Sequence, residues 1–255
     1  MRGRIAGALL VGLLAGESAW GGLGGAALAE GMIPLPEPAG QELLFRSRVR
    51  ADFLPLAGWF VTQANLAYCG VASAVMVLNS LGVPAPETPG YGPYRFWGQD
   101  NLFAAPAGRA FATAETVSRR GMTLAQLTGL LAAQGVTVQH WHGDQLSLPQ
   151  FRDLLLRSLS DPDDRLLVNY HRASLGQEGG GHISPLAAYD PAGDRVLILD
   201  VARYRYPAVW VATEALWRSI RTVDPDSGAS RGLVRISRGP ATATPPPPAR
   251  PPSGP

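Results

Sequence analysis

The chain has 255 residues, of which 46% are hydrophobic and 16% charged, a composition that excludes a disordered chain, a collagen and a coiled coil. The net charge of +2 is too small to hold a polyanion, so nucleic acid is not an expected partner. The single cysteine, Cys69, excludes an intrachain disulfide framework and a multi-cysteine zinc site.

The first 29 residues have the pattern of a secretory signal peptide. Arg2 and Arg4 precede an apolar run over 5–14, and Ala27 and Ala29 place small residues at a suitable cleavage point. The run is too short for a bilayer, which needs about 20 apolar residues. The pattern therefore predicts an exported, periplasmic protein that is cleaved after Ala29, with an uncleaved membrane anchor as the alternative.

Three helices are predicted before residue 160. The stretch Ala67–Leu81 is apolar nearly all round and stops at Gly82, as a buried helix would. Thr123 can cap a second helix that ends at Gly135, and Ser147 can cap a third. The second and third are amphipathic, so each should pack on one side only.

From Arg165 the pattern changes to short strands, which are interrupted by one helix over about 213–221. Helices first and an antiparallel sheet afterwards predict an α+β fold of two lobes, with any cleft between them. This folded part spans 30–238, and the eight prolines of 239–255 predict a disordered tail. The predicted strands cover residues 166–170, 183–189, 196–201 and 233–236.

Cys69 lies at the start of the first predicted helix, where unpaired backbone N–H groups and the positive end of the helix dipole favour a thiolate. The alternative is a small buried hydrophobe, which is common for a free cysteine. A lone thiol in an oxidising compartment is a liability unless it has a use, so export favours a nucleophile.

His182 and Asp200 supply the base and the partner that such a nucleophile needs. His182 opens one strand run, Asp200 closes the next, and a turn signal over 190–194 separates them. A hairpin centred near residue 191 or 192 would place residue 200, 201 or 202 opposite His182, with both side chains on one face of the sheet. Taken singly, His182 could be a polar strand end and Asp200 a strand cap.

Other polar residues carry weaker signals. Gln63 could donate its amide to an oxyanion beside Cys69, although on spacing alone it is a loop residue. Gly181 ends a glycine run that would let a substrate approach the backbone. His140 and His142 would share a face of a strand, but no third ligand is near them, so no metal site is predicted.

Five segments that extend over most of 59–237 carry a recognisable pattern: Thr62–Gly70, Val77–Asn79, Gly92–Arg95, Gly180–Leu186 and Leu199–Pro207. In these segments and in their order the sequence resembles the phytochelatin synthase family, particularly its short bacterial members. The resemblance implies a papain-like cysteine-peptidase fold, with a helical N-terminal lobe, an antiparallel β C-terminal lobe and the active site between them. It also implies a triad of Cys69, His182 and Asp200, with Gln63 in the oxyanion hole and Arg203 binding substrate.

The family acts on glutathione, so the resemblance implies a γ-glutamylcysteinyl thioester on Cys69 and release of glycine. Water would then give γ-glutamylcysteine, and a second glutathione would give a phytochelatin. No cofactor is obligatory in this scheme, although cadmium or zinc bound to glutathione thiolates would stimulate transfer. Ala64-Asn65-Leu66 replaces the Ser-Glu-Pro of eukaryotic members, and the proline-rich tail replaces their cysteine-rich region. Hydrolysis with weak transfer is therefore the expected activity.

Two other functions remain open from the sequence. A papain-like peptidase or amidase acting on another exported peptide would use the same three residues with a different acyl pocket. A non-catalytic thiol or metal-binding protein would use Cys69 and the histidines to hold metal, although one cysteine makes a poor metal buffer. A homodimer is also left open.

Overall fold

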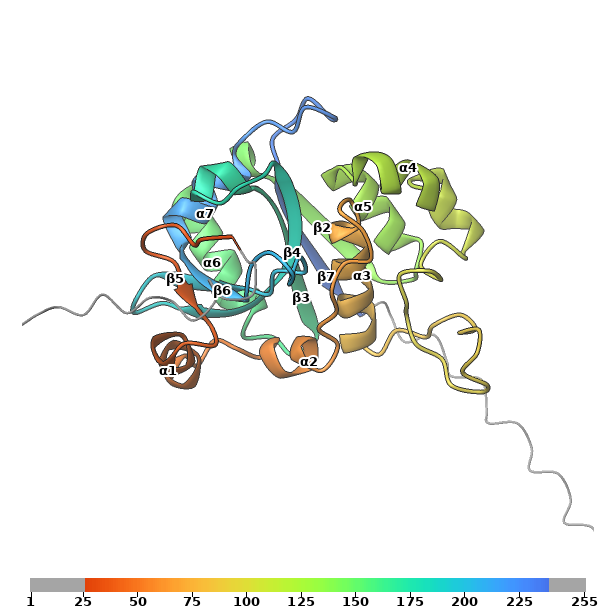
Figure 1. Ribbon diagram of the computed structural model, residues 1–255, viewed down its shortest axis with the longest axis horizontal. Helices are drawn as coiled ribbons and strands as arrows, with labels where there is room; N and C mark the ends of the chain where they lie inside the picture. The colour runs from red at the N-terminus through yellow and green to blue at the C-terminus, as the bar shows by residue number, and fades with distance from the viewer. Residues whose placement is uncertain (1–25, 239–255) are drawn as a thin grey trace, which may run out of the picture.

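The computed structural model describes residues 26–238, and its central feature is one antiparallel sheet (Figure 1). Over these residues the sheet has seven strands, in the spatial order β1-β6-β5-β4-β3-β7-β2. The strands are β1 (Ile33–Pro34), β2 (Thr137–His142), β3 (Asp164–His171), β4 (Gly181–Asp190), β5 (Arg195–Ile198), β6 (Val209–Ala212) and β7 (Gly232–Ser237).

Helices lie on both sides of this sheet. α3, α4 and α5 lie on one side, and α6 and α7 lie on the other (Figure 1). Each side has its own hydrophobic cluster, one built around α3 and α5 and one around α6 and α7. The α-helices are α1 (Pro38–Arg46), α2 (Phe53–Ala57), α3 (Cys69–Ser80), α4 (Ala114–Arg120), α5 (Leu124–Ala132), α6 (Leu148–Ser158) and α7 (Thr213–Ile220). Short 3₁₀ helices are η2 (Pro106–Ala110), η3 (Gly143–Gln145) and η4 (Arg172–Leu175).

The helix boundaries follow the capping signals of the sequence. Thr123 accepts a hydrogen bond from the Gln126 backbone and begins α5, and Ser147 does the same with Gln150 at the start of α6. Gly82 follows α3 with a φ of 65°, a conformation that costs glycine little. The three helices predicted before residue 160 are therefore confirmed.

The α+β class is confirmed, but the separation of helices from strands is less complete than predicted. β1, β2 and β6 were not among the predicted strands, and β2 comes from the helix-rich half of the chain to pair with β7. The predicted strand over 196–201 ends at Ile198. Strand pairing depends on distant partners, which a local pattern does not name.

The predicted tail over 239–255 and most of the predicted signal peptide lie outside the described residues. At the described end of that segment, the Ala26 N–H donates to the Arg205 carbonyl at 3.1 Å, and Leu28 packs against the cluster around α6 and α7. Cleavage after Ala29 would remove these contacts, and it stays a prediction. Within residues 26–238, no helix is both long and apolar enough to cross a membrane.

Candidate active site

Cys69 is the first residue of α3, and it lies buried between that helix and β4. The preceding residue, Tyr68, offers no side-chain cap, so the backbone N–H groups at this helix end stay available to an anion. The Ser73 hydroxyl, one turn further along, donates to the Ile183 carbonyl at 3.1 Å and fastens the helix to β4. This contact holds Cys69 near His182, the residue that precedes Ile183.

His182 lies next to Asp200, as predicted. The distance from His182 Nε2 to Asp200 Oδ1 is 2.9 Å, and both side chains are buried. Nε2 is therefore engaged with the carboxylate, which leaves Nδ1 for the thiol. The Tyr170 ring packs edge-on against the imidazole, with ring centroids 5.6 Å apart, and restricts its orientation.

A β-bulge, rather than the turn, brings His182 and Asp200 to one face. Next to the turn, Asp190 pairs with Arg195, so even-numbered residues of β4 face odd-numbered residues of β5. A bulge between Leu186 and Ala188 shifts the register, and Leu186 then faces Ile198. The predicted shared face is confirmed, but the predicted turn-centred register is wrong at the turn itself.

The charges of Cys69, His182 and Asp200 together favour a thiolate on Cys69 and an imidazolium on His182. Burial by itself raises the pKa of Cys69, but the hydrogen bond and charge of His182, with backbone hydrogen bonds at Ile183 and Gly70, bring the net pKa below the ordinary value. Burial lowers the pKa of His182, but the Asp200 carboxylate and the thiol raise the net pKa above the ordinary value. The two shifts have the signs of an ion pair.

Arg172, which the sequence analysis did not single out, holds the other side of Asp200. Its Nη2 donates to Oδ1 at 2.8 Å, and its Nη1 lies 2.8 Å from Oδ2. Burial alone would raise the pKa of Asp200, but the charges of His182 and Arg172 hold it well below its usual range. Arg172 begins η4, directly after β3, and a lone arginine at a strand end gives no local signal of such a partner.

A pocket of about 160 Å³ opens beside the thiol, and we call it the Cys69 pocket. Its wall contains Asn169 on β3 and, before β7, Asp224 and Arg231. Arg231 Nη1 donates to Asn169 Oδ1 at 3.1 Å and lies 3.8 Å from Asp224 Oδ2. The sequence did not predict these three residues, because Asn169 and Arg231 show only a polar side chain inside or next to an apolar strand and Asp224 lies in a loop.

Two donors of this wall have no partner within the part of the chain that the structure describes. They are Asn169 Nδ2 and Arg231 Nε, and their side chains are 2% and 5% exposed respectively. An unpaired buried donor costs about 1–3 kcal/mol, so a small shift of either side chain toward an acceptor in the pocket would be favourable. A carboxylate can accept from two donors at once.

The remaining predicted site residues lie at different places around Cys69. Gly181 lines the Cys69 pocket, and a Cβ there would lie 2.2 Å from Arg231 Nη1. Gln63 is buried and donates from Nε2 to the Asn65 carbonyl at 2.7 Å, which leaves a second N–H of that amide free of this bond. Arg203 lies instead in a separate hollow of about 460 Å³, where it donates to the Phe60 carbonyl.

His140 and His142 lie on β2, with their rings in edge-to-face contact at 5.7 Å. Over residues 26–238, no three His, Cys, Asp or Glu side chains gather closely enough to hold a metal ion. The expectation that this site contains no metal stays a prediction.

The fold and the site together define a class, namely α+β proteins in which a buried cysteine, histidine and aspartate lie in contact beside a small polar pocket. The phytochelatin synthase family model matches residues 24–233. The chain therefore belongs to the phytochelatin synthase family.

Curated relatives agree with this assignment. Glutathione gamma-glutamylcysteinyltransferase 3 of Lotus japonicus is 35% identical over 186 residues, and glutathione gamma-glutamylcysteinyltransferase 1 of Triticum aestivum is 36% identical over 186 residues. Glutathione gamma-glutamylcysteinyltransferase of Schizosaccharomyces pombe is 30% identical over 185 residues. These matches cover 73%, 73% and 72% of this chain but 37%, 36% and 43% of the respective relatives. The chain thus spans less than half the length of these relatives.

Proposed function

We propose that this protein cleaves the bond between the cysteinyl and glycyl residues of glutathione through a thioester on Cys69. The observation that carries this proposal is the buried contact of Cys69, His182 and Asp200 beside a small pocket with a polar wall. The names of the relatives, which are glutathione gamma-glutamylcysteinyltransferases, support the same substrate.

The chemistry follows from the ion pair. The Cys69 thiolate attacks the carbonyl carbon of the scissile amide, and the resulting oxyanion accepts hydrogen bonds at the start of α3 and from the free N–H of Gln63. When the C–N bond breaks, the His182 imidazolium gives its proton to the leaving glycine amine. Asp200 keeps the imidazole oriented throughout this step, as in other triads.

The Cys69 pocket suits the γ-glutamyl end of the substrate. At about 160 Å³ it is smaller than ordinary ligand sites of roughly 300–1,000 Å³, so it receives only part of the molecule. The α-carboxylate of the γ-glutamyl group accepts from Asn169 Nδ2 and Arg231 Nε, and the α-ammonium group faces Asp224. An α-linked peptide separates these two charges differently and fits this arrangement less well.

The acceptor is assigned to the separate hollow that Thr62, Arg203 and Tyr204 line. Burial raises the pKa of Tyr204, and the charges of Asp200 and Cys69 add to this against those of two nearby arginines. Arg203 would bind the glycyl carboxylate there. Water in this position gives γ-glutamylcysteine, and the amine of a second glutathione gives a phytochelatin.

The proposed function also includes a papain-like fold, a preference for hydrolysis and export to the periplasm. The packing of α3 against one side of the sheet supports a papain-like fold. Hydrolysis is the main reaction, cadmium or zinc enters only as glutathione thiolate complexes that serve as substrate, and the enzyme acts in the periplasm after export.

The test incubates the protein with glutathione, with and without cadmium, and identifies the products by mass spectrometry. Wild type should release glycine and γ-glutamylcysteine, and longer γ-glutamylcysteinyl oligomers would show transfer as well. Cys69→Ala should give neither product while its circular dichroism spectrum stays that of wild type. If folded wild type leaves glutathione intact, the proposal is wrong, and an amidase for another peptide becomes the better reading.

A further inference from the structure

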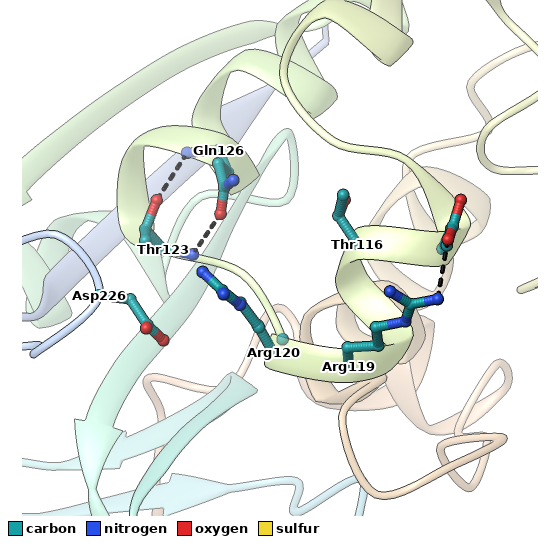
Figure 2. A pocket seen from close by; sticks show the side chains of 8 residues that line it. Thr116, Arg119, Arg120, Thr123, Gln126 and Asp226 are labelled. Atoms are coloured by element: carbon teal, nitrogen blue, oxygen red, sulfur yellow. Dashed lines mark hydrogen bonds and ion pairs between the residues drawn. The ribbon is translucent and has the colours of Figure 1, made fainter.

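Another hollow, different from the one that contains Arg203, adjoins the Cys69 pocket, and we call it the outer hollow. Its volume is about 490 Å³, and it lies between α4, the start of α5 and the loop before β7 (Figure 2). Arg120, Gly121 and Asp226 line both this hollow and the Cys69 pocket, so the two spaces meet at these residues. The function proposed above does not use the outer hollow.

A molecule held in the outer hollow alone does not contact the reacting groups. Neither Cys69 nor His182 lines this hollow, whereas both line the pocket that it adjoins. A molecule bound there reaches the thiol only through the Cys69 pocket, where the γ-glutamyl group lies under the proposed function. An extension of that group would pass directly into the outer hollow at the shared residues.

The charges of the hollow indicate what kind of extension it receives. Arg119 is paired with Glu115 at 2.9 Å, but Arg120 has no ion pair within residues 26–238. In Figure 2 the Arg120 side chain points toward the space between Thr123 and Asp226, and Arg120 lines both the outer hollow and the Cys69 pocket. An exposed guanidinium at this junction suits a carboxylate on the extension.

The geometry points to a donor subsite: the outer hollow binds a peptide unit that carries a free carboxylate and is attached to the α-amine of the γ-glutamyl residue. The α-amine is the end of that residue which the proposed function directs toward Asp224, two residues from Asp226. This inference rests on the proposed function and adds a donor longer than glutathione to it. The cleaved bond and the leaving glycine are unchanged.

The test compares two donors, glutathione and γ-Glu-Cys-γ-Glu-Cys-Gly, by the ratio of their kcat/KM values. Thr116 lines the outer hollow but not the Cys69 pocket, and it occupies the third position of α4 in a capping box with Thr113. Because glutamate and glutamine both serve at this position of a capping box, Thr116→Glu and Thr116→Gln differ only in charge. Ser118→Glu places the same charge on an exposed position of α4 outside the hollow.

Thr116→Glu should lower the ratio of extended donor to glutathione by about fivefold, equivalent to about 1 kcal/mol of repulsion on the added carboxylate. Thr116→Gln and Ser118→Glu should leave this ratio within about twofold of wild type. An unchanged ratio in Thr116→Glu would overturn the inference, as would a wild type that cleaves glutathione but not the extended donor.

A failure of the proposed function gives a different result. Wild type would then leave glutathione intact, and binding of the extended peptide to Cys69→Ala, measured by calorimetry, replaces the kinetic ratio. Weaker binding to Cys69→Ala/Thr116→Glu than to Cys69→Ala/Thr116→Gln would support the subsite, and equal binding would reject it.

Discussion

Arg172 binds the carboxylate of Asp200 through both of its terminal nitrogens, each 2.8 Å from a carboxylate oxygen. Asp200 is thereby fixed from one side by Arg172 and presents Oδ1 to His182 from the other. Ala202 N also donates to Oδ1, at 2.9 Å. Arg172 thus acts on the reacting groups through Asp200, which makes it a positioning residue.

Replacing Arg172 should therefore alter the ionisation of the site. Arg172→Lys keeps the charge but cannot bind both oxygens, so Asp200 will hold the imidazolium less firmly. We expect kcat to fall about tenfold, and the alkaline limb of the kcat/KM profile to move to lower pH as the pKa of His182 falls. A merely structural role would lower the melting temperature and leave that limb in place. An unmoved limb with wild-type kcat would contradict the assignment.

Asp200→Asn should lower kcat at least tenfold, because the neutral amide no longer stabilises the imidazolium. The same change leaves the buried Arg172 charge unpaired, which destabilises a protein by about 3–5 kcal/mol. The double variant Arg172→Met/Asp200→Asn removes both charges and should recover much of the lost stability in urea unfolding, but not the lost kcat. Wild-type turnover in Asp200→Asn would reject the role of this carboxylate.

The rate should show a bell-shaped dependence on pH. Since the pKa of Cys69 is lowered and that of His182 is raised, the thiolate–imidazolium pair forms as pH rises through the first value and is lost as pH rises through the second. kcat/KM should accordingly rise on the acid side and fall on the alkaline side. The ultraviolet absorbance of the Cys69 thiolate should rise along the same acid limb, and this rise should be absent in Cys69→Ala. A rate that keeps rising beyond the ordinary thiol pKa would contradict the ion pair.

Gly181→Ala should weaken substrate binding more than it slows the chemistry. The added Cβ would lie 2.2 Å from Arg231 Nη1, and the buried guanidinium must move away from its place beside Asn169. We expect the KM for glutathione to rise about tenfold, which corresponds to about 1.4 kcal/mol. Gly180→Ala is the matched control, because a Cβ there meets no atom within 4 Å. Equal KM values in the two variants would argue against the role of Arg231.

Local chemistry in the sequence determined α3, α5 and α6 and the position of the nucleophile. Thr123 and Ser147 cap helices through groups only three residues away. Cys69 lies near the start of an apolar stretch that forms a buried helix. His182 opens one strand run and Asp200 closes the next, so the sequence also predicted that they share a face. The helix caps and the apolar stretch depend on near neighbours, so a single chain reveals them.

Only the tertiary structure decided how these parts meet. The bulge beside Ala187 corrects a register that the turn alone would set wrongly, and no pattern in the sequence marks it. Arg172 reaches Asp200 across 28 residues, and Arg231 reaches Asn169 across 62. Such contacts depend on how β3, β4 and β7 pair, because a buried charge finds its partner only when the packed sheet brings the two together.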